Sequence, residues 1–598
     1  MKKSLRSFGI IAMAAVLALA ACGGGSGSSG GSSDGGGGGG GVKVALPNDG
    51  DGLSAVTAYK ISNAGQLKAI AKEVNDGNPD YTNAYYELTN DIDLSPFSSG
   101  TGWEPIGNDI SSPFSGTFDG GGFVISGLAI NDDTLEYVGL FGLIYDATVE
   151  NLGVEIASIT GKDFVGGVAG VVIDGVISNC HTTGNVKGNY FVGGVVGAVS
   201  GDVLGGVISN CSATGNVTGA GRNVGGVAGA VIDGSISDCH ATGNVTGADN
   251  NVGGVAGAVI GDVLGGGAIT NSYATGDIEG INQVGGLAGG VINGSISDCH
   301  ATGDVTGAGE NVGGATGIAE NSTISNTYAT GNVNGAGDNV GGIAGDIIDG
   351  SAITNSHATG DVTGTGNNVG GVAGHANSSD VKNSYATGSI IGGAYVGGVV
   401  GNVFTSNVEN CYATGNVKGD NWIGGVAGYL QHRNSSIVST VSNCYATGEI
   451  EGKNQVGGIA GSVSSYSNAY NCAALNSKIV REDLSPGTLI GRVIGSVITG
   501  HTGLISNNVA YVDMGGGALF GIRAHDNKDG ADISKLDATT NILPTTNYYS
   551  ALISPGPGLG WDFDGVPPIW KWGGTLYPLP ILYWQTETPA FPSHLQTP

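Results

Sequence analysis

The chain has 598 residues, of which 116 are glycine and only 21 are lysine or arginine, and its formal net charge is −29 at pH 7. This balance argues against a nucleic-acid partner, which requires basic patches that neutralise phosphates. It also argues against binding of the folded body to an anionic membrane. The glycines are strictly periodic, which indicates a repeat architecture and not a low-complexity chain.

The first residues predict an exported lipoprotein. A basic start at Lys2, Lys3 and Arg6 precedes an apolar run over 9–21 that is too short to span a bilayer, so residues 1–21 are interpreted as a signal peptide. Residues 19–22, Leu-Ala-Ala-Cys, resemble a bacterial lipobox. That resemblance implies lipidation of Cys22 and durable anchoring through several acyl chains. The alternative is an ordinary secretory signal with a chance cysteine.

Residues 22–41 are predicted to be the lipidated cysteine followed by a flexible Gly/Ser tether. By resemblance to Gram-negative sorting rules, Gly23 after the cysteine implies the bacterial outer membrane or cell surface. Residues 42–150 are assigned to an N-terminal cap and the first coils. Within them, residues 61–77 predict an amphipathic helix with Asn63 and Gln66 as a capping box. Its apolar face comprises Leu67, Ile70, Ala71 and Val74, and we expect it to cover the first coil.

From 151 to 510 a phrase containing "VGG" returns every 27 to 29 residues in most copies, and an insert "GDVLGG" lengthens two of them. Apolar residues stand in short β-branched runs broken by glycine, without helical periodicity. Such a fixed period indicates a solenoid whose coils stack on one another. We therefore predict an all-β fold, a right-handed parallel β-helix of about a dozen coils.

Two further columns of the repeat are predicted to be structural. A cysteine column, which serine or threonine occupies in other copies, is interpreted as buried small residues and not as a disulfide framework. A polar column is interpreted as an amide ladder at a corner, with a row of ligands as the alternative. Its asparagines are Asn179, Asn210, Asn271, Asn326, Asn355, Asn383, Asn410, Asn443 and Asn471.

The end of the chain departs from the repeat. Residues 511–585 are assigned to degenerate coils and an aromatic-rich C-terminal cap, because a bare terminal coil is an open β-edge. Residues 586–598, rich in proline and polar residues, are predicted to be a flexible tail.

Candidate ligand contacts are aromatic. Tyr385, Tyr412 and Tyr445 follow the cysteine column in successive coils, and we expect them to point outward. Variable loops before "VGG" add Tyr190, Tyr395 and Trp422. Exposed aromatic rings beside amides suit sugars, whereas a tyrosine ladder that only stiffens the rod is the alternative.

Enzymatic chemistry is not predicted. A β-helical polysaccharide lyase or glycosidase would need convergent carboxylates and a base, and no arginine stands beside an acidic cluster in sequence. The column of His181, His240, His300 and His357 occupies alternate coils, too widely spaced to share a metal. We expect no cofactor, with scattered surface Ca²⁺ as a weaker alternative. A single file of threonines makes ice binding a remote alternative.

Several phrases carry a family resemblance. Residues 139–142, "GLFG", the variant "VGGVAG" and the phrase "NCYATGNV" at 410–417 resemble bacterial surface proteins with GLUG repeats. The lead-in at 86–94, 103–108 and 114–128 and the exit at 560–563 and 576–584 are also similar to that family. Some members are metalloproteases that cleave immunoglobulin A, but no H-E-x-x-H stands here.

The resemblance implies a surface-attached adhesin. We therefore expect an adhesin or a carbohydrate- or protein-binding β-helix, with a lyase or glycosidase and a structural surface component as alternatives. Expected partners are the membrane, through the lipid anchor only, and a polysaccharide or a host or matrix protein. We expect a monomer.

Overall fold

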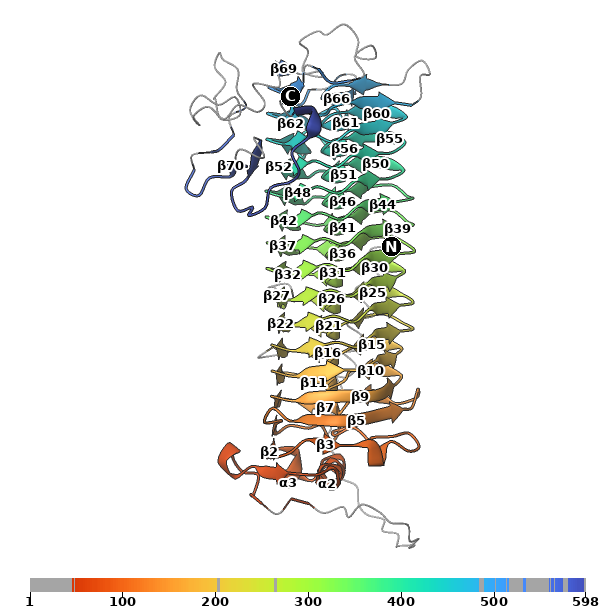
Figure 1. Cartoon of the computed structure of the whole chain (residues 1–598), viewed down its shortest axis with the longest axis vertical. Helices are drawn as coiled ribbons and strands as arrows, with labels where there is room; N and C mark the ends of the chain where they lie inside the picture. Colours follow the sequence, from red (N-terminus) through yellow and green to blue (C-terminus); the bar gives the residue numbers. More distant parts are fainter. Residues whose placement is uncertain are drawn as a thin grey trace.

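The computed structural model describes residues 46–47, 49–201, 205–262, 266–482, 489–498, 500, 502–511, 513–515, 531–533, 559, 561–563, 565–573 and 579–595. The predicted signal peptide, Cys22 and the Gly/Ser tether lie outside these residues, as do the centres of the two inserts. The described chain forms a long parallel β-solenoid of about 15 turns (Figure 1).

One coil illustrates the architecture. It begins on face D with β10 (Asp163–Val165), continues on face C with β11 (Ala169–Ile173) and on face A with β12 (Val176–Ser178), and crosses face B with β13 (His181–Thr183) and β14 (Val186–Gly188). The next strand, β15 (Tyr190–Gly193), pairs in parallel with β10, so each coil returns directly over the last. The backbone hydrogen bonds of the coils therefore run along the rod axis.

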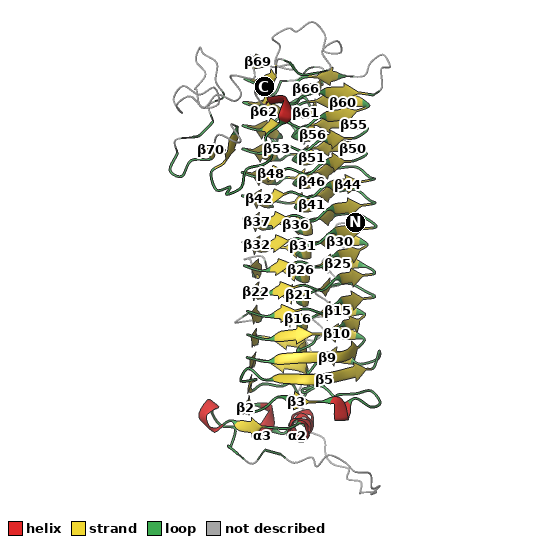
Figure 2. Ribbon diagram, viewed as in Figure 1, coloured by secondary structure: helices red, strands yellow, loops and turns green. Residues whose placement is uncertain are grey.

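Strands stack in columns along the rod (Figure 2). Face A has 16 strands, from β1 (Tyr59–Ile61) to β67 (Ile505–Ser506). Faces C and D have 13 each, from β7 (Phe141–Tyr145) to β66 (Ile494–Val497) and from β6 (Glu136–Val138) to β65 (Ile490–Gly491). The predicted dozen coils is thus a slight undercount, because the first coils carry no "VGG" phrase.

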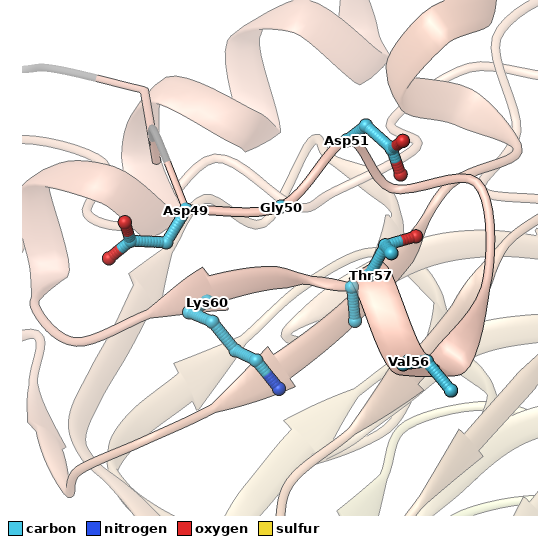
Figure 3. Close-up of a pocket in the computed structure, with 7 residues that line it drawn as sticks. Asp49, Gly50, Asp51, Val56, Thr57 and Lys60 are labelled. Atoms are coloured by element: carbon cyan, nitrogen blue, oxygen red, sulfur yellow. The ribbon is translucent and has the colours of Figure 1, made fainter.

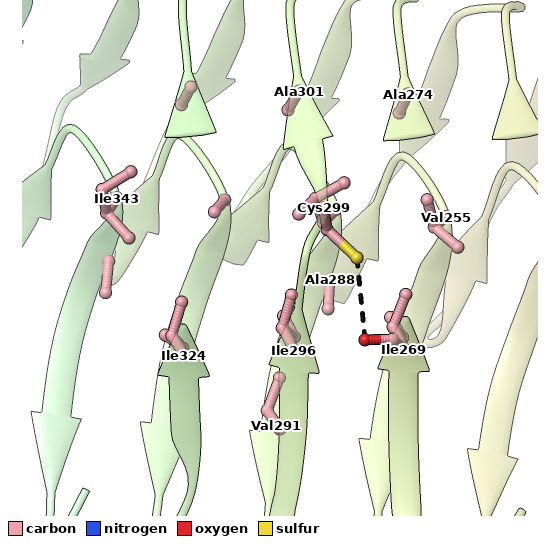
Figure 4. Close-up of a cluster of buried hydrophobic side chains, with 14 of the residues drawn as sticks. Val255, Ile269, Ala274, Ala288, Val291, Ile296, Cys299, Ala301, Ile324 and Ile343 are labelled. Atoms are coloured by element: carbon pink, nitrogen blue, oxygen red, sulfur yellow. Dashed lines mark hydrogen bonds between the residues drawn. The ribbon is translucent and has the colours of Figure 1, made fainter. Parts of the chain in front are cut away.

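Isoleucine and valine columns fill the inside of the rod. Ile269, Ile296 and Ile324 pair in register on face A, and each is fully buried (Figure 4). Burying one such side chain stabilises the fold by about 1.5–3 kcal/mol, so a dozen stacked coils supply the main driving force. The seven described cysteines are buried and free, as predicted, and the Cys299 thiol donates to the Ile269 carbonyl oxygen at 3.6 Å.

The corner between faces A and B explains the asparagine column. Every one of its asparagines has a positive φ, between 46° and 56°. Asparagine tolerates this left-handed conformation better than any other non-glycine residue except aspartate. The amides also bond from coil to coil: the Asn210 Nδ2 donates to the Asn179 Oδ1 at 2.7 Å, and the Asn443 Nδ2 donates to the Asn410 Oδ1 at 3.2 Å. The column therefore lies in a structural ladder.

The N-terminal end is closed by a helix, as predicted. α2 (Ala64–Asn75) begins after Asn63, whose side chain accepts a hydrogen bond from the Gln66 N–H, and the Gln66 side chain accepts one from the Ser62 N–H. Its apolar face is buried against the first coils. α3 (Pro79–Thr82), η1 (Ala55–Thr57) and η2 (Ser95–Phe97) lie at the same end. Neither α-helix of the described residues is long and apolar enough to cross a membrane.

The described part of the C-terminal segment after residue 558 does not take the expected position of a cap on the last coil. Its described residues between 559 and 595, here called the lateral clasp, lie along the side of the rod (Figure 1). The clasp contains a short antiparallel pair, β70 (Trp570–Trp572) and β71 (Pro580–Leu582), and ends in η3 (Ser593–Leu595). Trp561 Nε1 donates to the Asn471 carbonyl oxygen at 2.9 Å, and Trp584 Nε1 donates to that of Asn383 at 3.2 Å.

The expectation of a flexible tail from residue 586 is also wrong for residues 586–595. The Leu595 side chain is 1% exposed, and the His594 Nε2 lies 2.7 Å from the Leu475 carbonyl oxygen. These apolar and polar contacts hold the end of the clasp against the rod.

Candidate functional site

An aromatic ladder runs along face B. Its rings stack face to face, with centroids 4.6–5.2 Å apart and planes within 16° of parallel. The spacing equals the coil repeat of about 4.8 Å, so each coil contributes one ring. In chain order the rings belong to His240, Tyr273, His300, Tyr328, His357, Tyr385, Tyr412 and Tyr445.

The prediction that Tyr385, Tyr412 and Tyr445 contact a ligand from an exposed position is wrong. Their exposed fractions are 4%, 0% and 0%, because the lateral clasp covers this part of the ladder. The Tyr412 hydroxyl donates to the Gln585 Oε1 at 2.8 Å, and the Tyr445 hydroxyl donates to the Pro580 carbonyl oxygen at 2.7 Å. In addition, the neighbouring rings cover the ring faces that would stack on a sugar.

The histidines of the ladder alternate with tyrosine and do not form a metal site. Burial lowers the pKa of His357 to about 4, and burial also lowers the pKa values of His240 and His300. Trp584 of the clasp packs against His357 with ring centroids 5.9 Å apart. Throughout the described residues, no three histidine, cysteine, aspartate or glutamate side chains gather to hold a metal ion.

A second corner of the rod carries the remaining aromatic candidates. The residues that precede the "VGG" phrases form a column along the rod, here called the VGG corner. In the described coils from Tyr137 to Gln455, each of these residues has a positive φ, between 54° and 64°. Most of these residues are amides, which bond along the rod. The Asn339 Nδ2 donates to the Asn311 Oδ1, and the Asn368 Nδ2 donates to the Asn339 Oδ1, both at 2.8 Å.

Tyr395 and Trp422 interrupt this amide ladder. Their rings stack at 4.6 Å and 10°, and the ring of Tyr429 lies beside both, at 5.9 and 6.1 Å. These three residues are here called the aromatic corner. On either side of the break, the Asn368 Oδ1 and the Gln455 Oε1 are buried without a hydrogen-bond partner within the part of the chain that the structure describes.

The break is unfavourable for stability. A bulky residue in the left-handed region costs about 1–2 kcal/mol, and each buried acceptor left unpaired costs about 1–3 kcal/mol. Backbone strain of this kind gathers at functional sites. Asparagine at Tyr395 and Trp422 would avoid the backbone strain, and asparagine at Tyr395 would also donate to the Asn368 Oδ1, as Asn368 itself donates to Asn339.

Aromatic residues elsewhere at the VGG corner have a packing explanation. Phe164 and Phe191 stack at 4.8 Å and are 9% and 8% exposed. They cover an apolar patch on the outside of face C that includes Leu143, Val171 and Ala198. Apolar burial therefore offsets their strained backbone. Tyr395 and Trp422 stay half-buried and lie over a different surface.

The outside of face C changes from apolar to polar near the aromatic corner. The same register position that holds Ala230 and Ala258 holds Asp346 on β41 (Ala344–Ile348), His375 on β46 (Ala373–Asn377), Asn402 on β51 (Val400–Phe404) and Tyr429 on β56 (Ala427–Gln431). The row formed by Asp346, His375, Asn402 and Tyr429 is here called the polar strip. It occupies four successive coils.

Within the polar strip, the side chains of Asp346 and His375 contact each other. The His375 Nδ1 lies 2.9 Å from the Asp346 Oδ1, and the two side chains are 19% and 14% exposed. Asn402 accepts a hydrogen bond from the Gln431 Nε2 at 3.0 Å. The hydroxyls of Tyr395 and Tyr429 and the Trp422 N–H have no partner among the described residues. They form a set of polar groups at the edges of half-buried rings.

Of the predicted contacts, the structure brings together Tyr395 and Trp422, whereas Tyr190 stands apart. Tyr190 is 40% exposed and lies on a much earlier coil, over the backbone of Gly221. Sequence reasoning missed Asp346, His375 and Tyr429. The signal that could have found them is the second residue after the alanine that follows the "VGG" phrase, where "AGA" becomes "AGD", "AGH" and "AGY".

Two other features carry no evident chemistry. Asp277 and Asp304 lie on neighbouring coils, but each carboxylate accepts the backbone N–H of the next coil, as asparagine does elsewhere in that column. A pocket of about 360 Å³ near the N-terminal cap is lined by Asp49, Asp51 and Lys60, among others (Figure 3). The Lys60 ammonium pairs with Glu87.

Known proteins share the repeat. The model of the family described as "The GLUG motif" matches residues 188–218, 220–246, 280–306, 365–391 and 392–418. Halomucin of Haloquadratum walsbyi is 33% identical over 164 residues, 26% of this chain and 2% of that protein. A protein of Evansella cellulosilytica named "Putative Gly-rich membrane protein" is 35% identical over 121 residues, 18% of this chain and 13% of that protein. The chain thus spans only a small part of either relative.

A solved structure, named as that of a putative immunoglobulin A1 protease from Bacteroides ovatus, is matched over 62% of this chain and 79% of its own. It is 19% identical with a TM-score of 0.22. The matched family motifs span five segments between residues 188 and 418, within the stacked coils of faces A to D. The chain therefore carries GLUG repeats, and they build the coils of its parallel β-solenoid.

Proposed function

We propose that this chain is a surface-displayed binding module, an adhesin whose ligand contacts the aromatic corner and the polar strip. The module is anchored through lipid on Cys22 in the bacterial outer membrane or cell surface, and the Gly/Ser tether holds the rod away from the membrane. A relative named as a membrane protein supports the surface location. The acidic body favours solubility over membrane or nucleic-acid contact.

The break in the amide ladder is the observation that carries the proposal. Tyr395 and Trp422 replace residues that would relieve backbone strain, and an asparagine at Tyr395 would also pair the Asn368 Oδ1. Unlike Phe164 and Phe191, they gain no fully buried apolar contact in return. A backbone penalty that is offset only by a half-buried ring stack is expected where ligand binding maintains the residues.

The test restores the ladder that the neighbouring coils already have. The double variant Tyr395→Asn and Trp422→Asn is expected to be at least as stable as the native chain and to lose retention on an array of polysaccharides and matrix proteins. Because the variant stays folded, lost retention cannot be attributed to misfolding. The control is Phe191→Asn, which is expected to lower stability and to keep retention.

Unchanged retention of the Tyr395→Asn and Trp422→Asn variant on every array ligand would contradict the proposed site. The same wells are assayed for released reducing or unsaturated ends. We propose a non-catalytic, monomeric module, and product from any polymer would favour the alternative of a β-helical lyase or glycosidase.

A further inference from the structure

We infer that the ligand is a neutral polysaccharide chain, bound parallel to the rod axis across the aromatic corner and the polar strip. The inference rests on the proposed function, because it uses the same surface. It adds the chemical class of the ligand, its charge and its direction on the rod.

The hydrogen bonding of the solenoid argues against an extended peptide as the ligand. On faces C and D, backbone N–H and carbonyl groups bond to the coils before and after, as at Ala373 and Val400. The side of the rod therefore offers no free strand edge for backbone pairing, which is the usual way to bind an extended peptide. Recognition must use side chains, and hydroxyl groups of a sugar chain are suitable partners for them.

The polar groups at this surface match hydroxyl chemistry. Phenol groups of Tyr395 and Tyr429 both donate and accept, and the Trp422 indole N–H donates. They lie at the edges of a half-buried ring stack, so apolar carbon stands directly beside each polar atom. A sugar ring has the same alternation of C–H and hydroxyl groups. Pockets for small molecules likewise combine aromatic walls with a few placed polar groups.

Charge selects a neutral polymer over an acidic one. The Asp346 carboxylate faces outward in the polar strip. It already has two hydrogen-bond partners, the His375 Nδ1 at 2.9 Å and the Asn339 Nδ2 at 3.5 Å. The strip contains no lysine or arginine, and the whole chain carries a formal charge of −29. A sulfated or uronic polymer would therefore meet a repulsive field without a cationic partner. A cationic polymer would find no unpaired carboxylate in the strip.

The arrangement of the side chains determines the direction in which the ligand lies on the rod. The polar strip contributes one residue per coil from Asp346 to Tyr429, in register through three coil steps. At about 4.8 Å per step it extends roughly 14 Å along the axis. Across the axis, the strip is bounded by the VGG corner on one side. A ligand that contacts all of these residues must therefore lie along the rod.

The experiment uses the whole soluble chain and oligosaccharides of increasing length from neutral series: malto-, cello-, xylo- and manno-oligosaccharides, with heparin and polygalacturonate as acidic probes. Calorimetry is expected to show affinity for a neutral series that rises with length up to roughly 14 Å and then levels off. Binding is expected to be nearly independent of salt, because no ion pairs form.

Two variants test the assignment. Tyr429→Ser copies the serine found at the same position one coil later, Ser462, and is expected to weaken binding roughly tenfold or more, as loss of a central aromatic contact does. The control Ser462→Ala is expected to leave affinity unchanged. Each variant is checked for an unchanged far-ultraviolet spectrum and thermal transition.

The outcomes separate this inference from the proposed function. Binding of heparin, polygalacturonate or a protein that requires Tyr395 and Trp422 would overturn the neutral-polysaccharide inference and keep the binding site. Affinity that does not rise beyond a single sugar would overturn the axial direction. Absence of any binding that depends on Tyr395, Trp422 or Tyr429 would overturn both.

Discussion

Acid is expected to loosen the lateral clasp through a single histidine. His357 stacks between Tyr328 and Tyr385, and the Trp584 ring of the clasp packs against it at 5.9 Å, tilted by 35°. Burial holds the pKa of His357 at about 4, below the ordinary value of 6.5. The folded state therefore binds a proton less readily than the unfolded state. The stabilisation is fully present above pH 6.5 and is lost as the pH falls from 6.5 to about 4.

The size of the effect follows from the pKa difference. A fall from 6.5 to about 4, at 1.36 kcal/mol for each unit, corresponds to about 3 kcal/mol of local stability. Since the clasp and the ladder are packed together, the penalty is expected to appear as opening of the clasp. Hydrogen exchange of residues 579–595, corrected for intrinsic rates, should therefore accelerate by roughly a hundredfold between pH 7 and pH 4.

The repeat itself offers a matched control. Tyrosine occupies the same position in the neighbouring coils, so His357→Tyr keeps the ring stack and removes the titrating group. The variant should keep much of its protection at pH 4, because the tyrosine side chain does not gain a proton between pH 7 and pH 4. Equal acceleration of exchange in the native chain and in the His357→Tyr variant would refute the reasoning.

Three further outcomes are expected. Cys239→Ser should lower the free energy of unfolding by less than about 1 kcal/mol, because serine in the same column makes the same bonds. Cys239→Ala removes the acceptor of the Cys211 N–H and should lower the free energy of unfolding by about 1–2 kcal/mol. Both values are measured by denaturant titration. Asn326→Ala loses a ladder bond and strains a left-handed backbone, so exchange in its coil should accelerate more than in Asn326→Gly. Trp584→Ala should detach the clasp and make the buried Tyr385 reactive toward iodination, whereas unchanged protection would show that the other clasp contacts suffice.

The inward columns of the rod could be predicted because their cause is local and repeated. Each coil places Ile296 or its equivalent in the same position, so the pattern is visible in the sequence without knowledge of the structure. The left-handed corner was likewise foreseeable as an asparagine ladder. The handedness of the solenoid and the lipidation of Cys22 remain predictions.

The clasp could not be predicted, because its contacts join distant parts of the chain. Tyr412 and Gln585 are 173 residues apart, and Asn383 and Trp584 are 201 apart. An aromatic C-terminal stretch could cap the last coil or cover tyrosines on the side of the rod, and the sequence does not distinguish the two. The aromatic corner was partly foreseen: Tyr395 and Trp422 stood out in the sequence, whereas Tyr429 is recognised only when its register with Asn402 is known.

Stacking of coils on their neighbours also makes the rod adjustable. Removal or duplication of one coil before residue 383 would rejoin equivalent strands, and would move the aromatic corner relative to α2 by one step of about 4.8 Å. The coils between Asn383 and Leu475 lack that freedom, because the clasp bonds to both of these residues at once. The solenoid therefore combines a spacer whose length evolution can change in whole coils with a distal portion of fixed length.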